Sequence, residues 1–109
     1  MFRLQIDKTQ VEVLETEPMT SGSIGIYTLR CGFSDHWNGF EKTAIFYTND
    51  GEDAYRVPLD SNDSCVIPTG VLEEAGAEVF VGICGIKGDL KIPTVGVSIG
   101  NLLEGICNK

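Results

Sequence analysis

The chain has 109 residues, of which 42% are hydrophobic and 22% charged, the size and composition of one globular domain over residues 1–109. Eight Lys and Arg against sixteen Asp and Glu give a net charge of −8, and no run of basic residues is present to bind a nucleic-acid backbone. The N-terminus lacks the apolar core of a signal peptide and no stretch approaches the ~18 apolar residues of a membrane span, so we expect a protein that folds in a cytoplasm and binds neither nucleic acid nor membrane.

The first half of the chain is expected to form short strands. Residues 2–6 and 11–15 have strand character, residues 17–25 contain the Pro and Gly of a loop, and residues 42–48 form a further apolar run. Residues 24–33 alternate between apolar and polar side chains, which is the period of a half-buried strand. One face of this strand would carry Tyr27, Leu29, Cys31 and Phe33.

A hairpin is indicated next by Asp50-Gly51, which separates the strand at residues 42–48 from an apolar run at residues 54–59. Pro58 removes a donor from the ladder of hydrogen bonds, so we place the second strand at the edge of a sheet.

Residues 69–76 are the only segment with convincing helical character, after a turn at residues 60–64 and a short strand at residues 64–68. Thr69 can cap a helix of two turns, and Gly76 can end it in the left-handed conformation.

The last third of the chain returns to strands. Residues 78–87 are apolar on both faces, as in a central strand, and Gly88-Asp89 makes a tight hairpin to residues 90–93. The final strand is expected to place three apolar side chains on one face: Val95, Val97 and Ile99.

About eight or nine short strands, with turn signals every ~8–12 residues, indicate an all-β sandwich or barrel. Two packed sheets would bury the alternating faces. The predicted fold is therefore an immunoglobulin-like β-sandwich with one short helix.

Neither the cysteines nor the acidic turns predict a metal site. Cys31, Cys65 and Cys84 lie in apolar runs and are expected to be buried. These three and Cys107 are expected to be reduced thiols, and no two cysteines have the short spacing of zinc ligands. The turn at residues 60–64 begins like a calcium loop, but it lacks the glycine and the bidentate Glu that follow in such loops. Ordinary turn chemistry explains it and the turn at residues 49–53, so no metal or cofactor is expected.

No enzyme signature is present. The chain has neither a phosphate-binding loop nor a G-x-S-x-G elbow. His36 is the only histidine, and a pairing with Cys31 or Ser34 would join sequence neighbours at a strand end, which rarely form a nucleophile and base. Asp35 would point the opposite way. We predict that the protein is not an enzyme.

The stretch at residues 31–47 holds the only tryptophan, Trp37. Ser34 can start a turn and Asn38-Gly39 can supply the positive backbone angle that turns need. Trp37 would then fold back over one end of the sandwich while His36 faces solvent. The fold-closing core is predicted to be Phe33, Trp37 and Phe46.

An exposed aromatic platform for a sugar is the alternative for the aromatic residues of this region, which are Trp37, Phe40, Tyr47 and Tyr55. Burial is favoured because each large aromatic removes ~150–250 Å² from water, and a small sandwich has few other ways to gain that much. Exposure of Trp37 and Tyr55 would favour the sugar-binding alternative.

A resemblance to a known family covers nearly the whole chain. Residues 29–46, "LRCGFSDHWNGFEKTAIF", resemble a pattern in small proteins and N-terminal domains of tailed bacteriophages of Gram-positive bacteria, and later segments agree with it in order. The matching residues are Phe33, Trp37, Gly39, Thr43, Ala44, Phe46, Leu59, Cys65, Pro68, Gly82, Gly85, Pro93, Thr94 and Gly105. The resemblance implies a virion structural module of the tail, baseplate or fibre region and no catalytic residues.

Longer members continue after the closing glycine into a shaft or coiled coil, whereas this sequence has only four residues after Gly105. We therefore expect a small adaptor or decoration subunit of the tail, baseplate or head, in place of a fibre shaft. It would be assembled in the bacterial host cytoplasm, reside in the virion, and contact other virion proteins and further copies of itself. Its possible assembly contacts are Phe2, Leu4, Tyr55 and Ile106. The alternative functions are a glycan-binding module for host adhesion on the same fold and, last, an acidic inhibitor of a host nucleic-acid enzyme.

Overall fold

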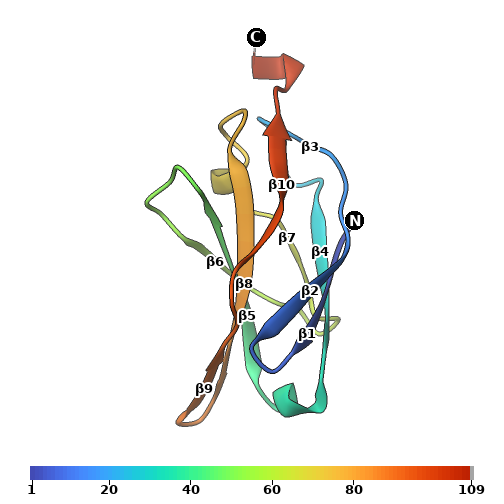
Figure 1. Ribbon diagram of the computed structural model, residues 1–109, viewed down its shortest axis with the longest axis vertical. Helices are drawn as coiled ribbons and strands as arrows, with labels where there is room; N and C mark the ends of the chain where they lie inside the picture. The colour runs from blue at the N-terminus through green and yellow to red at the C-terminus, as the bar shows by residue number, and fades with distance from the viewer. Residues whose placement is uncertain (109) are drawn as a thin grey trace.

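The computed structural model describes residues 1–108 and is mostly β, with two sheets of four and six strands, one of them curled into a half-barrel (Figure 1). The described chain is elongated, 47 Å by 25 Å by 21 Å. Its strands are β1 (Phe2–Asp7), β2 (Gln10–Glu15), β3 (Met19–Thr20), β4 (Thr28–Phe33), β5 (Glu41–Thr48), β6 (Tyr55–Pro58), β7 (Ser64–Val66), β8 (Glu78–Lys87), β9 (Leu90–Pro93) and β10 (Val97–Leu103).

The four-stranded sheet has the order β2-β1-β4-β7. β1 and β2 form an antiparallel hairpin whose turn places Lys8 at a φ of 53°, and β1 pairs in parallel with β4. The strict alternation of β1 buries Phe2, Leu4 and Ile6 on one face, while the residues between them are exposed. The strand at residues 2–6 is confirmed, and its period-two pattern directs Phe2 and Leu4 to the core, where the sequence analysis had expected assembly contacts.

The six-stranded sheet has the order β3-β10-β8-β5-β6, and β9 also pairs with β8. β8 is central and β6 lies at an edge, as predicted from the apolar run of β8 and from Pro58. The β5–β6 and β8–β9 hairpins are both present, and Gly88 adopts a φ of 59° in the predicted two-residue turn between Lys87 and Leu90.

The core lies between the two sheets. Its largest fully buried side chains come from both layers and from the connections: Trp37, Phe2, Phe46, Leu4, Ile6, Met19, Leu29, Ile67, Leu72, Ile83, Ile99 and Val71. Two packed sheets and a mostly β architecture are thus confirmed.

The predicted short helix is wrong. Residues 69–76 contain only a single 3-10 turn, Thr69–Val71, and Thr69 lies within that turn rather than capping a helix. Tertiary bonds prevail over helix propensity here, because the Leu72 carbonyl accepts the Gly22 N–H at 2.7 Å and the Gly76 N–H donates to Leu102 at 2.8 Å. Gly76 does adopt the predicted left-handed conformation, with a φ of 87°.

Val95 is a further difference from the sequence prediction. It lies before β10 and is 47% exposed, because its N–H bonds the Thr9 carbonyl at 2.9 Å while the chain crosses from β9 to β10.

In the part of the chain described, no helix has the length and apolar character needed to span a bilayer.

Candidate functional site

The connection between β4 and β5 closes the lower end of the molecule in Figure 1. A 3-10 turn at Asp35–Trp37 and Gly39, with a φ of 83°, fold Trp37 back so that it is fully buried. Its indole Nε1 donates to the Lys8 carbonyl at 3.0 Å. The predicted burial of Trp37 is confirmed.

Aromatic neighbours surround the indole. The Phe33 ring lies 5.0 Å from Trp37 and the Phe40 ring 6.1 Å, centroid to centroid. Phe46 is fully buried in the same core, and Phe33 packs against it while partly exposed. Trp37 is therefore not available for a sugar platform with Tyr55, and a Cβ on Gly70 would collide with the Tyr55 ring, which packs against that backbone.

His36 is 52% exposed, as predicted, and it lies near both a hydroxyl and a carboxylate. Its Nδ1 is 3.2 Å from Ser34 Oγ and 3.8 Å from Asp7 Oδ1. In a catalytic triad the nucleophile and the orienting carboxylate use different ring nitrogens. Both groups lie at the same nitrogen here, so this cluster does not have the geometry of a proton relay.

All four thiols are free, with Cys31, Cys65 and Cys84 buried and Cys107 exposed, and two of the buried ones lack the environment of a nucleophile. Burial in the core raises the pKa of Cys31 to about 12, and the nearby Cys65 and Asp63 act in the same direction. Burial likewise raises the pKa of Cys65 to about 12. A reactive cysteine needs the opposite shift, toward thiolate at neutral pH.

The acidic turns are stabilised by their own side chains. Asp60 Oδ1 accepts the N–H groups of Asn62 and Ser64 at 2.8 Å and 3.1 Å, and Thr48 Oγ1 accepts the Gly51 N–H at 3.0 Å. These are the hydrogen bonds of ordinary turns. Among residues 1–108, no three His, Cys, Asp or Glu side chains gather where they would hold a metal ion.

Two of the four predicted assembly contacts are wrong. Phe2 and Leu4 are 0% and 1% exposed, because β1 lies between β2 and β4 and directs these side chains into the core. Tyr55 is partly buried against the core. Ile106 is 83% exposed and so is accessible to a partner.

Ile106 belongs to a group of exposed apolar side chains on two segments that meet near the C-terminal end of the molecule (Figure 1). Residues 20–23 and 104–107 line one hollow, Ile24 and Ile26 follow the first segment, and Leu103 precedes the second. We call this group the apolar end. Its members are Ile24, Ile26, Leu103 and Ile106.

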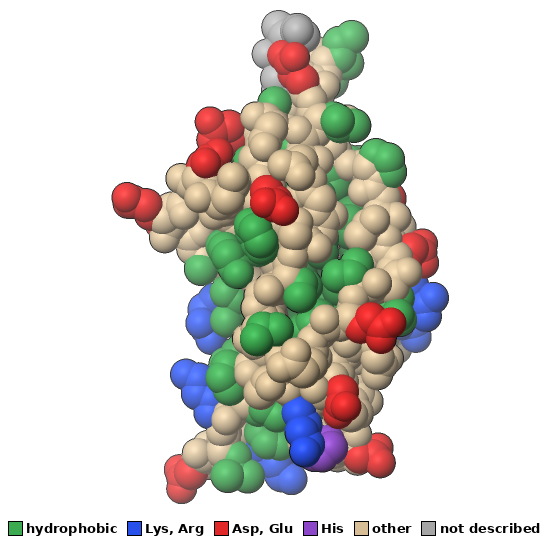
Figure 2. All heavy atoms as spheres, in the orientation of Figure 1, with side chains coloured by type: hydrophobic (Ala, Val, Ile, Leu, Met, Phe, Trp, Pro, Cys, Tyr) green, Lys and Arg blue, Asp and Glu red, His purple; other side chains and the backbone are tan. Residues whose placement is uncertain are grey.

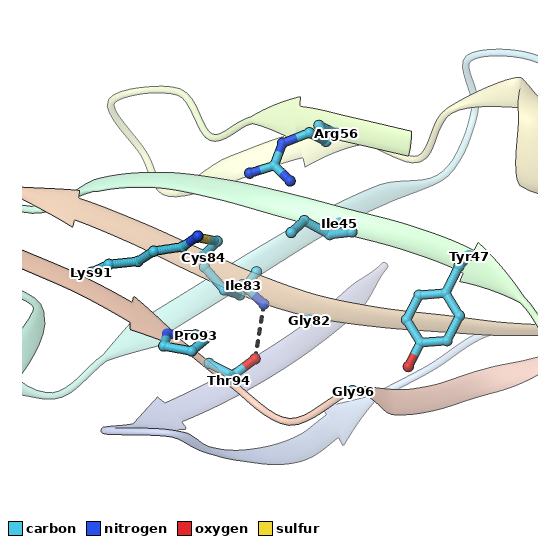
Figure 3. A pocket seen from close by; sticks show the side chains of 10 residues that line it. All are labelled: Ile45, Tyr47, Arg56, Gly82, Ile83, Cys84, Lys91, Pro93, Thr94 and Gly96. Atoms are coloured by element: carbon cyan, nitrogen blue, oxygen red, sulfur yellow. Dashed lines mark hydrogen bonds between the residues drawn. The ribbon is translucent and has the colours of Figure 1, made fainter. Parts of the chain in front are cut away.

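A second surface feature is a hollow of about 290 Å³ on the outer face of the six-stranded sheet (Figure 3). Ile45, Tyr47 and Gly82 line it from β5 and β8, and Arg56 and Lys91 line it from β6 and β9. Of these five residues, sequence reasoning named only Tyr47 as a candidate site residue, one aromatic of a possible sugar platform, and it missed the site because strand pairing brings the residues together. The one available signal was the alternation of Ile45 and Tyr47 with the buried Ala44 and Phe46.

The comparisons with known proteins add no relative: no protein-family model matches the chain, and neither a curated protein nor a solved structure matches it.

Proposed function

We propose that the protein is a non-enzymatic structural subunit of a tailed-bacteriophage virion, a small adaptor or decoration subunit of the tail, baseplate or head. It is assembled in the host cytoplasm and contacts other virion proteins and further copies of itself. The sequence resemblance at residues 29–46 supports the class of protein, and the apolar end is the structural observation that carries the assembly function.

The apolar end has the properties of a contact surface. Ile24, Ile26, Leu103 and Ile106 are 75%, 67%, 57% and 83% exposed, and the largest apolar patches on soluble proteins are often functional. A protein partner would remove these side chains from water at about 25 cal/mol per Å² of apolar surface. Binding at this end would therefore be driven mainly by apolar burial.

The backbone around the apolar end is fixed rather than frayed. The Ser21 N–H donates to the Leu103 carbonyl at 2.7 Å, and the Gly105 N–H donates to Ser21 Oγ at 3.0 Å. A Cβ on Gly105 would collide with the Ser21 carbonyl, so the two segments are in close contact. An ordered patch loses little conformational entropy when a partner binds.

An immunoglobulin-like arrangement is part of the proposal. In the order β3-β10-β8-β5-β6, the strands β10, β8, β5 and β6 are compatible with the G, F, C and C′ strands of a variable-type sheet. β4 pairs antiparallel with β7, as the B and E strands do. The parallel β1–β4 pair differs from the antiparallel pattern of that sheet.

The test is incorporation of variants into phage particles, measured by mass spectrometry of purified virions. Ile24→Ser with Ile106→Ser removes apolar surface from the apolar end. Leu90→Ser is the control, since Leu90 is 61% exposed at the first position of β9. We expect the double variant to remain folded by circular dichroism and to be lost from particles, while the control is incorporated. Normal incorporation of the double variant would reject the apolar end, and absence of the unmodified protein from particles would reject the structural function.

A further inference from the structure

The hollow on the six-stranded sheet is built by the crossover from β9 to β10. Thr94 Oγ1 accepts the Ile83 N–H at 2.9 Å and donates to the Val95 carbonyl at 2.9 Å, which holds the crossover against β8. Figure 3 shows Thr94 and Gly96 along one side of the hollow, with the Tyr47 hydroxyl directed toward Gly96. A Cβ on Gly96 would collide with that hydroxyl. The wall is thus closely packed and the hollow is preformed.

The charge of the hollow is opposite to that of the protein. Arg56 and Lys91 line it and no carboxylate does, although the chain carries sixteen acidic and eight basic residues. Within residues 1–108, neither cation lies within ion-pair distance of a carboxylate. Figure 2 shows Lys and Arg side chains beside hydrophobic ones on the side where β6 and β9 lie. An anion that enters the hollow meets two cations with no competing internal partner.

Apolar and aromatic side chains make up another part of the lining. Tyr47 stacks on Phe80 with ring centroids 5.3 Å apart and an angle of 10° between the planes, so its ring is held in place. Ile45, Cys84 and Pro93 belong to the apolar part. Such surfaces pack against the C–H face of a saccharide ring, while a hollow of about 290 Å³ is near the lower limit of ~300 Å³ for small-molecule sites.

We propose that this hollow binds an anionic saccharide: one sugar ring packs beside Tyr47 and Ile45, and its phosphate or carboxylate is bound by Arg56 and Lys91. Arg56 supplies the planar donor pair that suits both anions, and Lys91 supplies a point charge. The site lies on the outer sheet face, away from the apolar end, so it goes beyond the proposed assembly function and is tested separately from it.

The experiment is a titration of the full-length, ¹⁵N-labelled protein followed by amide chemical shifts. Glucose 1-phosphate and glucuronate are the anionic probes, and glucose, inorganic phosphate and a tetra-aspartate peptide are the comparison ligands. We expect both anionic sugars to shift the amides of Gly82, Ile83 and Gly96. Glucose and inorganic phosphate should each bind at least about tenfold more weakly than glucose 1-phosphate.

Charge variants identify the cations that bind. Arg56→Gln and Lys91→Gln should each weaken binding of glucose 1-phosphate by about tenfold, because each removes one charge-assisted contact. Arg30→Gln makes the same change in net charge at an exposed position on β4, in the other sheet, and should leave binding unchanged. The proposal would be overturned if binding were unchanged in both hollow variants or if Arg30→Gln weakened it equally. It would also be overturned if the shifted amides lay outside the hollow or if neither sugar caused any shift. Equal binding of glucose or inorganic phosphate, or tighter binding of the peptide, would overturn the assignment to an anionic saccharide.

Discussion

Truncation of Trp37 to Ala is expected to remove about 3–5 kcal/mol from the free energy of unfolding. The indole is fully buried between Phe33 and Phe40, so its loss leaves a cavity, and the Lys8 carbonyl loses its 3.0 Å hydrogen bond. Because a small domain is stable by only ~5–15 kcal/mol, the variant should unfold at much lower urea concentration. Far-UV circular dichroism during urea titration measures the loss.

Trp37→Phe separates the hydrogen bond from the ring. It keeps an aromatic side chain between Phe33 and Phe40 but removes the Nε1 donor, and the lost hydrogen bond to the Lys8 carbonyl should cost about 0.5–1.5 kcal/mol. A cost for Trp37→Phe equal to that of Trp37→Ala would show that the ring contacts contribute little.

Gly85 gives a sharper test of the same packing. A Cβ at Gly85 would lie 2.6 Å from Trp37 Cζ3 and 3.0 Å from Ile92 Cγ2, so Gly85→Ala should destabilise the parent by about 1–3 kcal/mol. In the Trp37→Ala background only the Ile92 contact remains, and the cost should fall by at least about 0.5 kcal/mol. If Trp37→Ala does not fold, Trp37→Phe replaces it in the cycle. An unchanged cost in both backgrounds would refute the contact between β8 and the indole.

Four further predictions concern the thiols, the first strand and the indole. Since burial raises the pKa of Cys31 to about 12 from a usual 9.0, its contribution to stability is fully present below about pH 9 and is lost as pH rises toward 12; unfolding free energy measured against pH should fall less steeply in Cys31→Val, and an identical slope would contradict this. Iodoacetamide at neutral pH should modify Cys107 alone in the native protein, a result read by peptide mass spectrometry and contradicted by early labelling of Cys65. Deletion of residues 1–5 should abolish the cooperative unfolding transition, because it removes Phe2 and Leu4 from the core, and native fluorescence of Trp37 should be blue-shifted.

Local patterns predicted the strands well because each pattern reflects the face that a strand buries. β1 buries every second residue, and the apolar residues of β8 occupy the centre of a sheet. The place of the turn before β5 was likewise predictable, since Gly39 adopts the predicted positive φ. Ser34 forms no side-chain cap, however, and the turn is held by backbone hydrogen bonds from Trp37 and Asn38. The same alternation shows that Phe2 and Leu4 belong inside, so their assignment as assembly contacts gave too much weight to their place near the chain end.

Features that depend on distant partners were not predictable. The segment at residues 69–76 has helical propensity, but its backbone bonds Gly22 and Leu102, which a single sequence does not reveal. The hollow has the same origin. Ile45 pairs with Arg56 on one side and with Gly82 on the other, so its lining depends on a strand order that the sequence pattern leaves open.

Two glycines of β8 allow the core and the outer face to be tested separately. Gly85 lies against Trp37, whereas a Cβ on Gly82 would lie 3.3 Å from Thr94 Oγ1 at the wall of the hollow. Residues three apart on a strand face opposite sides of the sheet. Gly82→Ala should therefore narrow the hollow and weaken binding of glucose 1-phosphate with little change in urea stability, because a contact of this length requires a shift of only a few tenths of an ångström. Gly85→Ala should show the reverse, lower stability with retained binding below its unfolding transition. If both substitutions changed stability and binding in parallel, the hollow and the core would not be independent. Binding of the anionic saccharide would then depend on the folding of the whole sheet, and its assignment to the hollow would be rejected.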